Sequence, residues 1–267
     1  MGRSFRSPAK VARRLKLAPL AARKLMSWPR FMCNYAFGLV PEQPYRFRNN
    51  ARIKIGRGVD HVPIIEIFLR EDYGTIEDGA VILDLGANIG IFAVYAAMSA
   101  RDVTVYAYEP MADFFTLMQE NIRLNTLNGA VRCFNAAVAG DAHSRDLFVQ
   151  GPGLFFPTLV PANQDSMTRK INVACTTLAD ILDSNELERV DLLTMDCEGA
   201  EYEILYGTPR RYFDRVREIR MEYHDRPEKG HNAQALATFL KGAGYDEIIQ
   251  PAAATAGTGT LWARRHG

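Results

Sequence analysis

The sequence predicts an α/β protein built on a doubly wound sheet of about seven strands, with the last strand antiparallel to the others. Two patterns predict this fold. From residue 80 onward, short apolar segments alternate with helical segments of about ten residues, which indicates parallel strands joined by crossover helices. Only about eight residues separate the final two expected strands, too few for a crossover helix, so the last strand should be reversed.

The expected elements follow in order along the chain. Prolines at positions 8, 19, 29, 41 and 44 divide the first 45 residues into short pieces, some of them helical. One or two short strands are expected within residues 46–55. Longer strands are expected over residues 81–85, 103–108, 131–134, 146–149, 171–174, 190–195, 216–222, 245–249 and 258–263. Helices are expected over residues 62–73, 89–100, 112–127, 178–183, 200–206 and 233–241.

Charge divides the chain into an arm and a body. Residues 1–30 carry nine Lys or Arg and no acid, whereas the remaining 237 residues carry 23 basic and 31 acidic side chains. We expect residues 1–60 to form a basic, partly helical extension and residues 61–267 to form the main domain, with a β-rich insertion at about 142–174. The arm of residues 1–30 is a candidate for contact with an anionic membrane surface or a protein, and a solvated extension is the alternative.

Composition excludes several classes of protein. The chain is 48% hydrophobic and 24% charged, as ordinary soluble proteins are, and its longest apolar run, residues 91–100, is too short to span a bilayer. The four cysteines are far apart without a CxxC pair, which argues against a zinc ribbon or a disulfide scaffold. We therefore expect a cytoplasmic protein, at a membrane surface if the arm binds lipid, and no nucleic-acid partner.

The first motif with chemical content is DLGANIG, residues 84–90, at a strand-to-helix junction. Gly86 lets the backbone turn tightly, the small Ala87 lets a ligand approach the main chain, and Gly90 lets the following helix pack against the strand. Free backbone N–H groups at the helix start suit the carboxylate of a bound amino acid. Asp84 can hold a cationic amino group, directly or through water.

A dinucleotide site is the main competitor for this motif. Its GxGxxG fingerprint is absent, because Asn88 and Ile91 occupy the positions of two of its residues. The spacing DxGxNxG, with an acid before the first glycine, favours S-adenosylmethionine, so Asn88 joins the residues expected to bind this cofactor.

Glu109 strengthens the same interpretation. It lies 25 residues after Asp84, directly after an expected strand, where a carboxylate can accept hydrogen bonds from both ribose hydroxyls of an adenosine. The alternative is an exposed acid at a helix start, favoured by the helix dipole. Asn135 and Ala136 follow the next strand, where the adenine edge would lie, and a plain loop is the alternative there.

A third group of residues is acidic. The segment DLLTMDCEGAE, residues 191–201, places Asp196 at the end of the strand beside the cofactor strand, with Glu198 two residues later. Glu201 is expected to cap the following helix. Glu222 and His224 end the next strand, so topology alone brings Asp196, Glu198, Glu222 and His224 to one edge of the sheet.

This acidic edge can perform acceptor chemistry. Methyl transfer from a sulfonium is an in-line displacement, and a hydroxyl acceptor must also lose its proton. His224 is the best candidate for the general base, because its unperturbed pKa lies near neutrality. The carboxylates can orient it, hold the acceptor, or bind a divalent cation such as Mg²⁺. The ligands of that ion would be Asp196, Glu198, Glu222 and His224.

Taken together, these motifs resemble the FkbM family of methyltransferases. The resemblance covers roughly residues 76–224 and rests on VILDLGANIGIF, VYAYEP, LMQENIRLN, VDLLTMDCEGAEYEIL and IRMEYH. It implies a Rossmann-like class I methyltransferase fold, S-adenosylmethionine as the methyl donor, and O-methylation of a hydroxyl on a sugar, glycan or secondary metabolite. Cys197, where such proteins usually carry an aliphatic residue, is a mild departure.

Three other functions remain open. A nicotinamide-dependent oxidoreductase is disfavoured by the missing GxGxxG, and N-methylation could use the same carboxylates. A noncatalytic partner that binds a glycan or a second enzyme would have no reason to keep the acidic edge. The acceptor itself is not encoded in any motif, although the loop around Phe155, Phe156 and Pro157 can cover it, with a local hydrophobic plug as the alternative. Oligomeric state is likewise not encoded.

Overall fold

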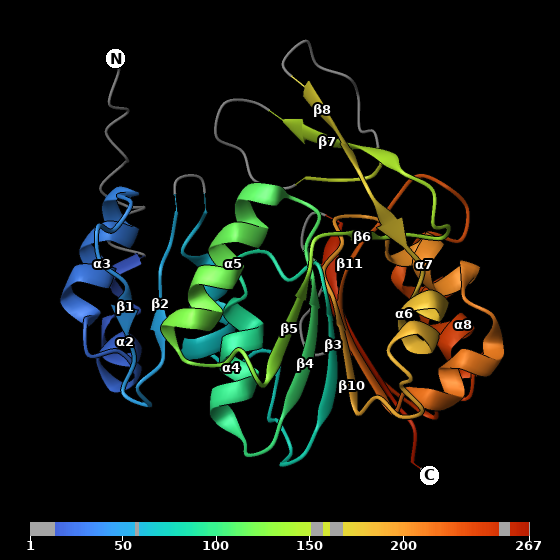
Figure 1. The fold of residues 1–267 in the computed structure, drawn as a ribbon, viewed down its shortest axis with the longest axis horizontal. Helices are drawn as coiled ribbons and strands as arrows, with labels where there is room; N and C mark the ends of the chain where they lie inside the picture. The colour runs from blue at the N-terminus through green and yellow to red at the C-terminus, as the bar shows by residue number, and fades with distance from the viewer. Residues whose placement is uncertain (1–13, 57–58, 151–156, 161–167, 251–256, 267) are drawn as a thin grey trace.

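A seven-stranded mixed sheet forms the centre of the computed structural model, which describes residues 14–56, 59–150, 157–160, 168–250 and 257–266 (Figure 1). The strand order is β12-β13-β11-β10-β3-β4-β5. β13 runs antiparallel to both of its neighbours, and the other neighbouring pairs are parallel, which confirms the predicted fold. The strands are β3 (Val81–Leu85), β4 (Thr104–Tyr108), β5 (Val131–Phe134), β10 (Leu192–Met195), β11 (Glu218–His224), β12 (Glu247–Ile249) and β13 (Thr258–Arg264).

Helices cover both faces of this sheet. Figure 1 shows α4 and α5 on one face and α6, α7 and α8 on the other. Their bounds are α4 (Ile91–Ser99), α5 (Ala112–Leu124), α6 (Leu178–Ser184), α7 (Glu201–Gly207) and α8 (Ala233–Gly242), with a 3₁₀ turn, η2 (Arg210–Arg215), before β11. Side-chain oxygens of Thr177 and Asn232 cap the starts of α6 and α8.

The middle strands are buried on both faces, and their sequences explain why. All four residues of β10 are buried, and so are four of the five residues of β3. Parallel strands covered by helices on both sides need such continuous apolar runs. Because β3 and β10 are adjacent, with Leu85 opposite Met195, their carboxyl ends emerge side by side.

The described part of the N-terminal extension packs on the same core. It contains α2 (Ala18–Lys24), α3 (Trp28–Phe37), β1 (Tyr45–Arg46) and β2 (Arg52–Ile53), which confirms the short helices and strands expected there. Buried side chains of Ala21, Phe31 and Ile53 belong to the common hydrophobic core. The helix expected over residues 62–73 is present but shorter, since helical residues run from 62 to 69 and most of them form a π-helix, η1 (Ile64–Leu69).

Asn121 on α5 joins this extension to the main sheet layer. Its side chain is fully buried, accepts a hydrogen bond from Lys54 N (2.8 Å), and donates to Lys54 O (3.1 Å) and Ile89 O (2.9 Å). One amide therefore connects the chain after β2 to the residues just before α4.

The insertion lies beyond the carboxyl ends of the central strands. Its two predicted strands are confirmed as the antiparallel pair β7 (Arg145–Gln150) and β8 (Thr168–Val173). A short parallel pair, β6 (Ala137–Val138) and β9 (Cys175–Thr176), flanks them and was not predicted. Phe155 and Phe156, expected to cover the acceptor, lie outside the described residues.

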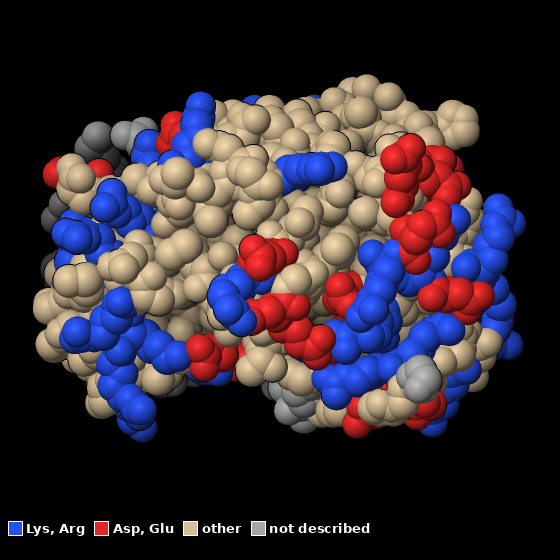
Figure 2. All heavy atoms as spheres, turned by 60° about the horizontal axis from the view of Figure 1, so that its bottom comes forward, with Lys and Arg blue, Asp and Glu red and all other residues tan. Residues whose placement is uncertain are grey.

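The surface carries both signs of charge. On the face shown in Figure 2, Lys and Arg side chains are prominent over the N-terminal elements at the left. Residues 1–13 of the basic arm lie outside the described residues, so its contact with a membrane or a protein stays a prediction.

Within the described residues, every helix is too short or too polar to cross a bilayer. The four cysteines are free thiols, as expected.

Candidate active site

The loop after β3 is held in a conformation that requires glycine. Gly86 has φ +84°, and its N–H donates to the carbonyl of Tyr108 at 3.0 Å, as does that of Ala87 at 2.9 Å. A Cβ placed on Gly86 would lie 2.0 Å from the carbonyl oxygen of Asp196, far inside van der Waals contact. The loop therefore lies directly against the end of β10.

Asp84, the acid that precedes this loop, is buried with an unused acceptor. Thr194 donates a hydrogen bond to Oδ1 at 2.9 Å, whereas Oδ2 has no partner among the described residues. Burial raises the pKa of Asp84 to about 7, and the hydrogen bond from Thr194 offsets part of that rise. A cationic amino group would supply what Oδ2 lacks.

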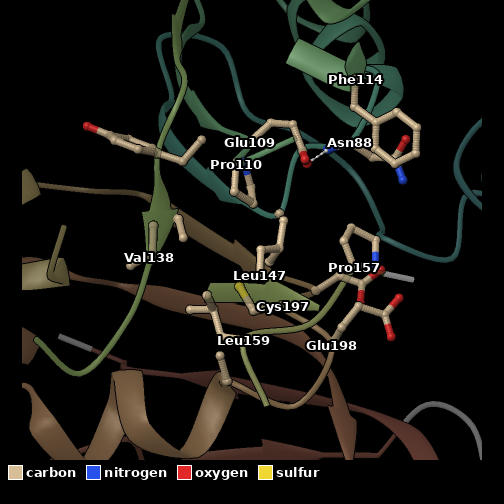
Figure 3. A pocket seen from close by; sticks show the side chains of 15 residues that line it. Asn88, Glu109, Pro110, Phe114, Val138, Leu147, Pro157, Leu159, Cys197 and Glu198 are labelled. Carbon is tan, nitrogen blue, oxygen red and sulfur yellow. Dashed lines mark hydrogen bonds between the residues drawn. The ribbon is translucent and has the colours of Figure 1, made fainter. Parts of the chain in front are cut away.

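Glu109 lies at the end of β4 and is tied to the same loop. Its Oε2 accepts the N–H of Asn88 at 2.8 Å, drawn in Figure 3, and its Oε1 accepts the N–H of Met111 at 2.8 Å. Burial raises its pKa to about 7 against the lowering effect of these two bonds. Each carboxylate oxygen keeps a second lone pair, which is the geometry needed to accept two ribose hydroxyls.

A pocket opens between Glu109 and the acidic edge. Glu109 and Glu198 lie on opposite sides of it in Figure 3. Its apolar lining comes from Phe114, Val138, Leu147, Pro157 and Leu159. Such a mixture of an apolar wall and a few polar groups suits the base and sugar of a nucleoside.

A second pocket continues on the other side of the loop. It shares Gly86, Asn88 and Asp196 with the first pocket, and Asp84, Glu66 and Tyr73 complete its polar side. A ligand that crossed the loop would place one end beside Glu109 and the other beside Asp84. The two pockets together can therefore hold an adenosine joined to an amino acid.

The acidic edge predicted at the ends of β10 and β11 is assembled around His224. Nε2 of His224 lies 3.4 Å from Oε2 of Glu198 and 4.0 Å from Oε1 of Glu222. Asp196 belongs to the same group, close enough to share an ion with His224. Burial lowers the pKa of His224, but the surrounding carboxylates, Glu201 first among them, outweigh it and raise the pKa to about 9. His224 is thus protonated at neutral pH, whereas the expected role of general base requires a pKa near neutrality.

Glu201 has two roles, of which the sequence indicated one. Its Oε1 accepts the N–H groups of Cys197 (3.0 Å) and Gly199 (3.2 Å), which is the expected helix-start role. The same oxygen lies 3.4 Å from Nδ1 of His224, so Glu201 also belongs to the acidic edge. The contact with His224 could have been inferred from the position of Glu201, because the first residue of α7 faces the end of the neighbouring strand β11.

The predicted residues differ in how close they lie to the pockets. Asp196 and Glu198 line the first pocket, while Glu222 and His224 stand behind them. Asn135 and Ala136 are absent from the residues that line either pocket, and Ala137 and Val138 line the first one instead. The side chain of Asn135 donates to the carbonyls of Glu109 (2.8 Å) and Pro110 (3.1 Å), so it supports the loop that carries Glu109.

Sequence reasoning missed most of the apolar lining. Phe114 lies at the start of α5 outside any motif, and Leu147 and Leu159 come from the insertion, which has no motif either. Thr158 of the insertion donates a 2.6 Å hydrogen bond to the carbonyl of Glu198. The insertion therefore completes the wall of the pocket next to the acidic edge.

Comparison with known proteins gives a family match and several relatives. Residues 84–247 match the family model described as the methyltransferase FkbM domain. The chain is 25% identical over 208 residues to the 31-O-demethyl-FK506 methyltransferase FkbM of Streptomyces tacrolimicus, a match that covers 68% of this chain and 79% of that protein. It is 28% identical over 234 residues to the AMB antimetabolite synthetase AmbE of Pseudomonas aeruginosa, covering 72% of this chain but only 11% of that protein's length.

Solved structures of other proteins resemble this one more loosely. Methyltransferase FkbM from Methylobacillus flagellatus KT superposes with a TM-score of 0.49 at 13% sequence identity, over 96% of this chain and 60% of that chain.

Proposed function

The chain belongs to the FkbM family of methyltransferases, and from that premise we propose that it moves the methyl group of S-adenosylmethionine onto a hydroxyl group of a small molecule or glycan. The observation that carries the proposal is the shared pocket, because Glu109 and Glu198 line the same cavity. Glu109, proposed to accept hydrogen bonds from the ribose hydroxyls, and Glu198, proposed to accept a proton, therefore face the same cavity.

The residues around the loop fit the donor chemically. Asp84 has a buried, unpartnered Oδ2 for the amino group, and Glu109 has free lone pairs for the ribose. Gly86 lines both pockets and lies where they meet. When bound, S-adenosylmethionine would supply an electrophilic methyl group, and alignment does much of the work in such a displacement.

Glu198 is the side chain best placed to receive the proton of the acceptor. It lines the pocket, whereas His224 lies 3.4 Å behind its Oε2 and lines neither pocket. With the donor bound, the Glu198 carboxylate would take the proton of the acceptor hydroxyl as the methyl group leaves the sulfonium for the acceptor oxygen and S-adenosylhomocysteine is released. His224 then acts as a positioning residue that holds this carboxylate in place through Nε2, and Glu201 holds His224 at the opposite ring nitrogen, Nδ1, at 3.4 Å.

The preference for oxygen over nitrogen has a separate support. The relative from Streptomyces tacrolimicus is named for an O-demethyl acceptor. An amine acceptor is the second candidate, because four carboxylates near the pocket would attract a cation. The two acceptors are separated by where the methyl group appears.

Transfer of an isotopically labelled methyl group tests the proposal. The protein would be incubated with trideuteromethyl S-adenosylmethionine and a panel of sugars, polyketides and amines, and the products analysed by mass spectrometry and NMR. We expect label on a hydroxyl oxygen. Label only on nitrogen would overturn the O-methyl assignment, and binding of NAD(P) in place of the donor would overturn the methyltransferase assignment at this site.

Glu198→Gln tests the role given to that carboxylate. Loss of a positioned proton acceptor should lower kcat by about 10²–10⁴-fold while donor affinity stays within about twofold. Glu188→Gln is the matched control, since the Glu188 side chain is 85% exposed and does not line the pocket. Wild-type kcat in Glu198→Gln would show that another group takes the proton.

A further inference from the structure

We propose that three residues of the acidic edge, Asp196, Glu201 and His224, bind a divalent first-row transition-metal ion. Each residue offers one ligand atom, and these atoms all lie within 4.8 Å of one another. Atoms bound to one ion at about 2.0–2.4 Å can be no more than about 4–5 Å apart, so small side-chain movements complete the site. The three residues come from the end of β10, the start of α7 and the end of β11.

A second and independent observation is that the three residues have buried polar atoms that are poorly satisfied. Oδ1 of Asp196 and Oε2 of Glu201 lack a hydrogen-bond partner within the described part of the chain, and Nδ1 of His224 has only the 3.4 Å contact with Oε1 of Glu201. The Glu201 side chain is fully buried, and its Oε1 already accepts two backbone N–H groups, which fixes where Oε2 points. Buried polar atoms without partners are costly, and one shared cation would satisfy all three.

Charge supports the same conclusion. Glu198 and Glu222 lie within 4.0 Å of His224 as well, so four carboxylates surround one imidazole. Among the described residues, none of the four forms an ion pair with Lys or Arg. A partly buried excess of negative charge is stabilised by a divalent cation.

The ligand types indicate which ion. Mg²⁺ and Ca²⁺ prefer sites made only of oxygen, whereas an imidazole nitrogen with two carboxylates suits Mn²⁺, Fe²⁺, Co²⁺ or Zn²⁺. The sequence predicted Asp196, Glu198, Glu222 and His224 as the metal ligands. The proposed site keeps Asp196 and His224 and has Glu201 in place of Glu198 and Glu222. It leaves Glu198, which lines the pocket, free to contact the acceptor.

The role of the ion, though not its binding, rests on the proposed function. An ion at this position would lie beside Glu198, at the edge of the pocket proposed to take the acceptor. There it could bind the acceptor oxygen and lower the pKa of the hydroxyl, so that the proton leaves more easily.

Metal titration in the absence of donor and acceptor tests the site. The full chain, without a histidine tag and dialysed against a chelator, would be titrated with Zn²⁺, Mn²⁺ and Mg²⁺ by calorimetry. Free Mn²⁺ would be followed by electron paramagnetic resonance. We expect one ion per chain, with Zn²⁺ bound more tightly than Mn²⁺ and Mn²⁺ more tightly than Mg²⁺.

Variants assign the binding to these residues. His224→Ala and Asp196→Asn should each weaken Zn²⁺ binding at least about tenfold, and Glu201→Gln should do the same if it folds. His143→Ala is the matched control, because the His143 side chain is 89% exposed and should leave the affinity unchanged. Thermal melting of each variant identifies any that has unfolded.

The outcomes separate this inference from the proposed function. Absence of a one-to-one complex with Zn²⁺ or Mn²⁺, or equal weakening by His143→Ala, overturns the metal site. Full hydroxyl methylation by chelated protein with no metal bound overturns its role and leaves the proposed function intact. A metal complex in a protein that methylates no hydroxyl acceptor would overturn the proposed function alone.

Discussion

The backbone N–H of Asn88 donates a 2.8 Å hydrogen bond to Oε2 of Glu109, although 21 residues separate them in the chain. Asn88 can do so because it adopts a left-handed conformation, φ +51°, in the loop after β3. The bond joins the loop beside Asp84 to the carboxylate at the end of β4. The residues proposed for the two ends of the donor are therefore held as one unit.

Replacement of Gly86 by alanine should abolish this arrangement. The new Cβ would meet the Asp196 carbonyl at 2.0 Å, in addition to the cost of φ +84°, so we expect marked destabilisation and loss of S-adenosylhomocysteine binding. Gly79→Ala is the matched control, since Gly79 has φ +74° and a Cβ added there would meet nothing within 4 Å. It should cost only about 1–2 kcal/mol and leave affinity unchanged. Equal effects in calorimetry and urea unfolding would contradict the close contact.

Donor affinity should rise with pH through neutrality. Burial raises the pKa values of Asp84 and Glu109 to about 7, and each carboxyl must be ionised to accept hydrogen bonds from the ligand. Below pH 7 each should therefore weaken binding of S-adenosylhomocysteine by up to about tenfold per pH unit. Calorimetry from pH 6 to 8 measures this. Glu109→Gln should remove one of the two contributions, and an unchanged profile in that variant would refute the role of Glu109.

The same pKa shifts should act on stability in the opposite direction. The ordinary pKa is 3.8 for Asp84 and 4.5 for Glu109, so the unfolded chain loses these protons well before the folded chain does. Their contribution to the free energy of unfolding is full below about pH 3 and falls as pH rises to 7, by up to about 4 kcal/mol for Asp84 and about 3 kcal/mol for Glu109. Urea unfolding of wild type and Glu109→Gln should diverge over this range, with Glu109→Gln becoming relatively more stable as pH rises. A constant difference would contradict the shift.

Asn121 should be important for stability rather than chemistry. Asn121→Ala would leave the N–H of Lys54 and the carbonyl of Ile89 without their partner, at a cost of about 2–4 kcal/mol. Thermal or urea unfolding gives this cost, and Thr116→Ala on the exposed side of α5 serves as the control. Activity of the folded fraction should be retained. A loss within about 0.5 kcal/mol would mean that water replaces the lost bonds.

The sequence predicted the central sheet well, because apolar segments alternate regularly with helical segments there and turn residues separate them. β3 and β5 match their expected bounds, since each is a short apolar run that ends in turn or polar residues. The helix expected over residues 62–73 is present but ends at Leu69, because the next three residues, Arg70, Glu71 and Asp72, are charged and the chain turns there. The two-residue strands β6 and β9 are too short to show a hydrophobic period. They form only by pairing with each other, and the paired residues are 38 positions apart in the chain.

The site was predictable where topology determines position. Strand order alone brings Asp84, Glu109 and Asp196 to one edge, and the structure places all three beside the pockets. The environment of His224 was not predictable, because its pKa depends on distances to carboxylates that only folding sets. The apolar wall from Leu147 and Leu159 was missed for a related reason, since the insertion folds back from a segment without a motif.

Titration of the protein with S-adenosylhomocysteine and, separately, with NAD⁺ tests the central claim most directly. The account predicts a one-to-one complex with S-adenosylhomocysteine that is lost in Gly86→Ala, and no measurable heat with NAD⁺, because Glu109 and Asp84 occupy the two ends of a site shaped for an adenosine joined to an amino acid. Binding of NAD⁺ without binding of S-adenosylhomocysteine would contradict it.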